Sequence, residues 1–230
     1  TSSKELLEKI GKDEAYFYAD CIDGSICDIY FASDDEIIVM PSYCEEFSSF
    51  IKEFFESGIK KFSYNTKELH RLAAKMGINC NNVCGDLMLS AYLLRPSDTN
   101  YDIDHMCLEY GITVPEYQNE MGGVEQAVSF AAVLKPLFDK TNILLEEAEQ
   151  TKLLTDIELP LARVLGKMEI AGFEVDKEGI EAFGKRLSER LKELTAEIYS
   201  SVGHEFNINS PKQLAVILFE EMGIPCKKKP

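Results

Sequence analysis

The sequence lacks several features that mark particular classes of protein. None of its apolar runs approaches the length that a helix needs to span a bilayer. Its start shows no basic segment followed by an apolar core, so we expect no signal peptide. These absences favour a cytoplasmic protein without a membrane partner.

Cysteine and histidine are too scattered to indicate a disulfide framework or a metal centre. The seven cysteines are an odd number, and the closest pair, Cys80 and Cys84, has no second pair or histidine at zinc-ligand spacing. The three histidines, His70, His105 and His204, each stand without a nucleophile or ligand partner at a recognisable spacing. We therefore expect reduced thiols and no metal site.

Basic charge is scarce in the first two thirds of the chain. The formal net charge is −16, and residues 151–230 hold twelve Lys and Arg against thirteen Asp and Glu, a net of −1, which leaves −15 for residues 1–150. Surfaces that bind nucleic acid are normally basic because they neutralise phosphates. Residues 1–150 are therefore a poor candidate for a DNA-binding surface, whereas residues 151–230 permit one.

The pattern of residues 1–150 predicts an α/β domain with a mixed sheet. A short helix over 3–11 precedes three β-rich runs at 15–19, 26–32 and 36–40, and turn signals between them indicate an antiparallel meander. A further strand is expected at 61–64. Helices are expected at 44–57, 66–76, 86–94, 103–110 and 124–150, the last with a kink or break at Pro136.

From residue 155 the pattern changes to almost pure helix. Asp156 is predicted to cap a helix that stops at Gly172, and Asp176 is predicted to cap a longer helix that ends at Gly203. Apolar residues recur every three or four positions along the longer helix: Ile180, Phe183, Leu187, Leu191, Leu194, Ile198 and Val202. Such a helix projects from its domain or packs against a partner helix.

The last predicted helix begins at Ser210. Pro211 stands at the first helical position, where a missing N–H costs nothing, and Gln213 forms a capping box with Ser210. The free N–H groups of this helix start, beside Asn207 and Lys212, can hold a phosphate. Most Ser-Pro caps only start a helix, so both interpretations stay open at this point.

Four linked motifs resemble a known family. They are IELPL at 157–161, MEIAGFEVD at 168–176, FNINSPKQL at 206–214 and ILFE at 217–220. In order and spacing, residues 155–230 resemble family A DNA polymerases of the bacterial DNA polymerase I type. The resemblance implies that residues 153–230 form the start of the polymerase domain, a truncated set of thumb helices. It also implies that Asn207 and Ser210, with Lys212 beside them, contact the backbone of a primer–template duplex.

In the same family, the preceding domain has the fold of a proofreading 3′–5′ exonuclease. Residues 1–152 resemble that domain in order and length, most clearly over 61–77 and 86–94. The resemblance implies an α/β RNase H-like domain with a mixed sheet, followed by an all-helical thumb segment. Asp86 matches an aspartate of the family that is not one of its metal ligands.

Most carboxylates of the family's exonuclease pattern are absent. Two-metal chemistry needs several carboxylates, which the family supplies as Asp-x-Glu on the first strand, an Asp on a helix and Tyr-x-x-x-Asp on a late helix. Here these positions hold Asp20 and Ile22, then Leu69, then Phe130 and Leu134. Leucine cannot coordinate a hard cation, so we predict a vestigial exonuclease that binds no catalytic metal.

Together, these expectations predict a scaffold segment of a polymerase whose catalytic residues lie outside these 230 residues. The chain begins without Met and ends on Lys227-Lys228-Lys229-Pro230, which we interpret as cuts in a longer DNA-directed DNA polymerase. The segment alone should be inactive and should hold no cofactor. Magnesium is expected for the parent enzyme. Besides DNA, the partner of the segment is expected to be the rest of the polymerase chain. Two alternatives stay open: an active 3′–5′ exonuclease with displaced ligands, and a protein-interaction module that uses the acidic face of residues 1–150.

Overall fold

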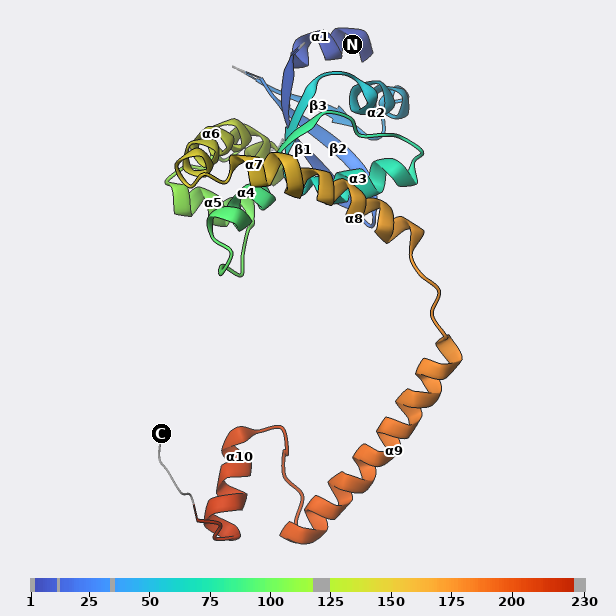
Figure 1. Ribbon diagram of the computed structural model, residues 1–230, viewed down its shortest axis with the longest axis vertical. Helices are drawn as coiled ribbons and strands as arrows, with labels where there is room; N and C mark the ends of the chain where they lie inside the picture. Colours follow the sequence, from blue (N-terminus) through green and yellow to red (C-terminus); the bar gives the residue numbers. More distant parts are fainter. Residues whose placement is uncertain (1–2, 12, 34–35, 118–124, 226–230) are drawn as a thin grey trace. The chain divides into compact units, whose positions relative to one another are not determined.

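The computed structural model describes residues 3–11, 13–33, 36–117 and 125–225 (Figure 1). Cys226, the lysine run at 227–229 and Val124, the expected start of one helix, lie outside the described residues. The chain divides by packing into two compact units, Thr1–Gly172 and Phe173–Pro230. Each unit is described by itself.

A five-stranded mixed sheet forms the centre of the first unit. Its strands are β1 (Glu14–Ile22), β2 (Ser25–Ala32), β3 (Ile37–Pro41), β4 (Lys60–Ser63) and β5 (Val83–Asp86), in the order β3-β2-β1-β4-β5. β1, β2 and β3 form the predicted antiparallel meander, while β4 pairs in parallel with both β1 and β5. The mixed sheet is confirmed. β5 was not predicted, because four residues that include a glycine show no strand periodicity.

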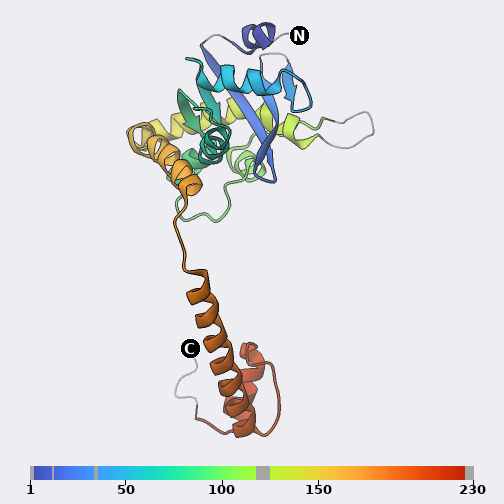
Figure 2. The same cartoon turned by 90° about the vertical axis from the view of Figure 1, so that its right-hand side faces the viewer.

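Helices cover both faces of this sheet (Figures 1 and 2). On one face, α1 (Ser3–Ile10), α2 (Phe47–Glu56) and α3 (Thr66–Lys75) close a core rich in phenylalanine: Phe17, Phe31, Phe47, Phe50, Phe54 and Phe55. On the other face, α4 (Leu87–Leu94), α5 (Ile103–Tyr110) and α6 (Gln126–Glu147) enclose a second core. The positions of the predicted exonuclease pattern therefore lie on or beside a sheet that is packed on both faces.

α6 continues through Pro136, so the helix does not break there, and the alternative of a kink stays a prediction. Its buried residues lie on both sides of the proline and include Val133, Leu134, Leu137 and Phe138. Packing of these residues against the second core holds both halves of α6 in one helix, although proline removes a backbone hydrogen bond there.

A helical stretch after α6 packs against α3. It consists of α7 (Thr151–Leu153), the π-helical segment η1 (Leu154–Glu158) and α8 (Leu159–Ala171). Asp156 lies inside this stretch, so the prediction that it caps the helix is wrong: the helix already begins at Thr151. Residues 153–172 pack within the first unit; the functional limit between 152 and 153 stays a prediction.

The second unit is helical, as the fold prediction expected. Asp176 caps α9 (Lys177–Val202) by accepting a hydrogen bond from the backbone N–H of Gly179, and Gly203 ends the helix at φ 89°. α10 (Pro211–Ala215) continues directly into η2 (Val216–Glu221). Between the two units, residues 172–176 are all exposed. The apolar stripe of α9 is also partly exposed in the described unit.

Candidate functional site

Some of the predicted exonuclease positions meet at an open pocket between β1 and α3. The pocket has a volume of about 320 Å³ and is lined by Tyr18, Ala19, Asp20, Cys21, Tyr64, Asn65, Glu68 and Leu69. β1 is irregular here, because its pairing with β2 shifts between Ala19 and Cys21. This irregularity leaves Asp20 unpaired in the ladder, with its side chain available to the pocket.

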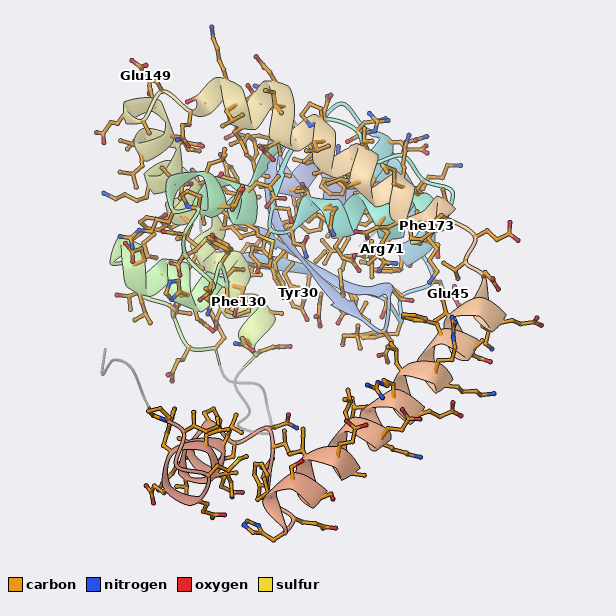
Figure 3. All side chains as sticks on the ribbon, turned by 60° about the horizontal axis from the view of Figure 1, so that its bottom comes forward. Tyr30, Glu45, Arg71, Phe130, Glu149 and Phe173 are labelled. Carbon is orange, nitrogen blue, oxygen red and sulfur yellow. The ribbon has the colours of Figure 1, made fainter. Side chains whose placement is uncertain are left out.

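The structure brings together only part of the predicted set. Asp20 and Leu69 line the pocket, but Leu69 is 2% exposed and belongs to the phenylalanine-rich core. Phe130 packs edge-on against Tyr18, with 5.4 Å between ring centroids, and can be located on α6 in Figure 3. Leu134 is fully buried in the second core, and Ile22 is half exposed beyond the pocket.

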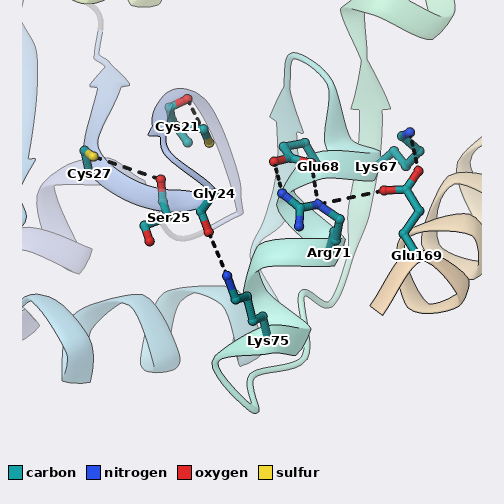
Figure 4. A network of polar contacts seen from close by, with 10 residues as sticks. Cys21, Gly24, Ser25, Cys27, Lys67, Glu68, Arg71, Lys75 and Glu169 are labelled. Atoms are coloured by element: carbon teal, nitrogen blue, oxygen red, sulfur yellow. Dashed lines mark hydrogen bonds and ion pairs between the residues drawn. The ribbon is translucent and has the colours of Figure 1, made fainter. Parts of the chain in front are cut away.

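Glu68 is the second acid of the pocket, and it is already paired with a cation. The Nε of Arg71 donates to one carboxylate oxygen of Glu68 at 2.7 Å and its Nη2 donates to the other at 2.5 Å (Figure 4). Hydrogen bonding from Arg71 lowers the pKa of Glu68, so the carboxylate stays ionised. The i, i+3 spacing of the two residues on a predicted helix is the sequence signal that could have indicated this pair.

The other polar groups of the pocket are weak ligands for a metal ion. Burial raises the pKa values of Tyr18, Tyr64 and Cys21 to about 12, which keeps these groups protonated at neutral pH. Among the residues that the structure describes, no group of three or more His, Cys, Asp and Glu is arranged to hold a metal ion. This donor set does not fit a site for two hard cations.

Asp86 is a buried acid whose carboxylate holds the starts of two helices through hydrogen bonds. It is 1% exposed and accepts hydrogen bonds from the backbone N–H and hydroxyl of Thr66, at 2.6 and 2.7 Å. It also accepts from the backbone N–H groups of Asn65, Met88 and Leu89. One carboxylate therefore caps the start of α4 and binds the start of α3, which fixes one wall of the pocket.

The tip of the second unit is organised by internal hydrogen bonds. Ser210 Oγ accepts from the backbone N–H of Gln213 at 3.4 Å, as the predicted cap requires. The Oε1 of Gln213 accepts from the backbone N–H of Asn207 at 2.8 Å, and not from that of Ser210 as a capping box would. Asn207 Oδ1 in turn accepts from the backbone N–H of Asn209 at 3.1 Å.

These bonds leave donors free at the tip. The oxygen of Asn207 is used internally, so its amide NH₂ remains available, and the hydroxyl of Ser210 still carries a hydrogen that it can donate. Asn207 and Lys212 are exposed, and Ser210 is half-buried. The predicted residues thus lie within one short segment with donors and one positive charge.

Comparison with known proteins gives two family matches. Residues 12–123 match the model for the DNA polymerase I ribonuclease H-like domain, and residues 177–230 match the model for DNA polymerase family A. The chain belongs to DNA polymerase family A. Among the described residues of this family A segment, no helix is both long enough and apolar enough to cross a membrane.

Curated relatives of the chain include DNA polymerase I from several bacteria. The segment is 33% identical to DNA polymerase I of Bacillus subtilis (strain 168) over 196 residues, covering 79% of this chain and 22% of that one. It is 36% identical to DNA polymerase I of Lactococcus lactis subsp. cremoris (strain MG1363) over 182 residues, covering 73% and 20%. The chain therefore spans about a fifth of the length of these relatives.

A solved structure supports the fold. The POL domain of Pol1 from M. smegmatis, in complex with a DNA primer-template and dNTP, matches with a TM-score of 0.80 and 23% identity. The match covers 99% of this chain and 41% of that one. The predicted fold, an RNase H-like exonuclease domain followed by a helical segment, is thus confirmed.

Proposed function

We propose that this family A segment supports a DNA polymerase whose catalytic residues lie outside it. Its exonuclease-like unit is catalytically inactive, and its last helices contact the backbone of a primer–template duplex. The proposal rests above all on Leu69 and Leu134, the buried leucines at two predicted metal-ligand positions. The whole protein would transfer nucleotides with magnesium bound by carboxylates elsewhere in its chain.

Packing as well as composition supports the proposed loss of the nuclease. Leu69 belongs to one core and Leu134 to the other, so both side chains serve the fold. An ionised carboxylate at either position would have to be buried among apolar groups, which is strongly unfavourable. The positions that hold metal ligands in the family's exonuclease pattern are thus occupied here by core residues.

The inactive unit has a second use, because it fixes α8. Gly166 of α8 lies directly against the backbone of α3, and His70 of α3 is buried at the contact. Lys67 Nζ reaches Glu169 Oε1 of α8 at 2.6 Å. The exonuclease-like unit thus gives a rigid base to the helix that precedes the last unit in the chain.

A nuclease assay tests the first half of the proposal. The chain is incubated with 3′-labelled single-stranded DNA and either magnesium or manganese, and we expect no cleavage. Cleavage that disappears in Asp20→Asn but persists in Asp23→Asn would overturn the proposal in favour of an active exonuclease. Asp23 is a suitable control because it is an exposed acid of the adjacent turn that does not line the pocket.

A DNA-binding titration tests the second half. Binding of a labelled primer–template duplex is followed by fluorescence anisotropy at several salt concentrations. We expect Asn207→Ala and Ser210→Ala to weaken binding, and Lys212→Ala to reduce the logarithmic salt slope by about 0.9, the value for one phosphate contact. Lys192→Ala, which removes an exposed lysine of α9, should leave the slope unchanged. Equal effects of Lys192→Ala and Lys212→Ala would contradict a contact at the tip.

A further inference from the structure

The carboxylates beside the pocket are balanced by side-chain cations. Arg71 contacts both oxygens of Glu68, and its Nε lies 3.8 Å from Glu169 Oε2 on α8. Glu169 also binds Lys67. Arg71 is thus held between an acid of its own helix and an acid of a helix about a hundred residues later in the chain, as Figure 4 shows.

The guanidinium has the properties that this position requires. Its planar donors match the two oxygens of a carboxylate, and it stays charged at any pH at which the protein folds. Arg71 and Glu68 are each about one quarter exposed, so water screens their attraction only in part. A second cation, Lys75, reaches the carbonyl oxygen of Gly24 in the turn that follows β1.

A divalent cation would face strong competition here. To bind at the pocket it would need the carboxylates of Asp20 and Glu68 together, because the remaining described donors are neutral. Binding through Glu68 would require the cation to displace both hydrogen bonds from Arg71 and to approach a fixed positive charge. Metal binding is therefore opposed in two ways: the ligands at the predicted positions are missing, and Arg71 occupies both oxygens of Glu68.

We propose that Arg71, which lies beside this pocket and pairs with Glu68 of its lining, is a built-in counter-cation that takes the place of a metal ion and keeps divalent cations out. The proposal rests on the proposed inactivity of the exonuclease-like unit and adds a positive cause to it. In this arrangement the chain itself supplies the positive charge beside Glu68, and that charge also links α3 to α8 through Glu169.

Manganese binding to the full 230-residue chain tests this idea by electron paramagnetic resonance of free Mn²⁺. We expect no saturable binding to the unmodified chain. Arg71→Met, which keeps an apolar stem and removes the charge, should gain one site at least about tenfold tighter than any residual binding. Adding Glu68→Gln to that variant should abolish the gain. Lys75→Met is the matched control, because it removes the same charge nearby but leaves the Glu68–Arg71 pair intact.

Two results would overturn the proposal: no gain in Arg71→Met, or an equal gain in Lys75→Met. If Arg71→Met does not fold, the unmodified chain still decides the matter by NMR. We expect added Mn²⁺ to leave the amide signals of Asp20 and Glu68 unbroadened, and selective broadening there would refute the role of Arg71. Cleavage of single-stranded DNA, in contrast, would refute the proposed function itself.

Discussion

Gly166 offers a direct test of how α8 is attached to the exonuclease-like unit. A Cβ atom at this position would lie 2.9 Å from the carbonyl oxygen of Lys67 and 3.1 Å from the backbone nitrogen of Arg71. Both are backbone atoms of α3, so neither can rotate away. Gly166→Ala therefore forces α8 and α3 apart or distorts one of them.

Two opposing effects determine the size of the change. Alanine favours a helix over glycine by about 1 kcal/mol, whereas overpacking a tight contact costs about 1–3 kcal/mol. Displacement of α8 also moves Glu169 away from Lys67, a half-exposed pair worth at most about 1 kcal/mol. We expect Gly166→Ala to lower the free energy of unfolding of the first unit by about 1–2 kcal/mol, because the packing terms exceed the propensity gain.

Urea unfolding followed by tyrosine fluorescence measures this change. The chain has no tryptophan, and nine of its ten tyrosines precede residue 118, so the signal reports mainly on the first unit. Gly184→Ala in α9 is the control, since a Cβ there has no heavy atom within 4 Å. That variant should only gain helicity in circular dichroism. Stabilisation of the first unit by Gly166→Ala would refute the close contact between α8 and α3.

Three further predictions concern charged groups. Burial lowers the pKa of His70 from 6.5 to about 4, so on acidification the unfolded chain takes up a proton before the folded chain does. The contribution of His70 to the free energy of unfolding should be constant above pH 6.5 and fall by about 3 kcal/mol towards pH 4. A flat pH profile that His70→Asn leaves unchanged would contradict this. Asp86→Ala leaves several buried N–H groups without an acceptor and should destabilise the chain by about 3–5 kcal/mol in denaturation experiments; a loss below about 1 kcal/mol would be inconsistent with its role. The hydrogen bond to Glu221 raises the pKa of His204; NMR titration should detect a decrease in Glu221→Gln, and an unchanged value would exclude that bond as the cause.

The sequence predicted the layout of the fold well where local signals were strong. The β1–β3 meander follows from alternating Tyr, Phe and Ile separated by Asp23-Gly24, and the caps at Asp176 and Ser210 follow from local hydrogen bonding. Prediction failed where distant residues decide the outcome. The packing of α6 on two sides of Pro136 and the parallel pairing of β5 with β4 are tertiary effects.

The candidate site was less accessible to sequence analysis. Motif positions identified Asp20 and Leu69, which do line one pocket, but they do not include Glu68 and Arg71, whose pairing only the i, i+3 spacing on a predicted helix could have indicated. The link from this pair to Glu169 joins elements about a hundred residues apart, for which one sequence has no periodic signal. The five-donor environment of Asp86 is equally invisible, because its donors come from the starts of two separate helices.

The exposed link between the two units has a practical consequence for proteolysis. Phe173 is 88% exposed and directly follows Gly172, at which α8 ends. Proteases cut preferentially at exposed segments outside helices and strands, and chymotrypsin prefers a large aromatic side chain at the cleavage point. A brief digest should therefore cut after Phe173 and also after Tyr43, which is 86% exposed in the turn that follows β3. In a Tyr43→Ser variant, the cut after Phe173 would release the helical unit, so that its DNA affinity and the stability of the exonuclease-like unit could be measured separately.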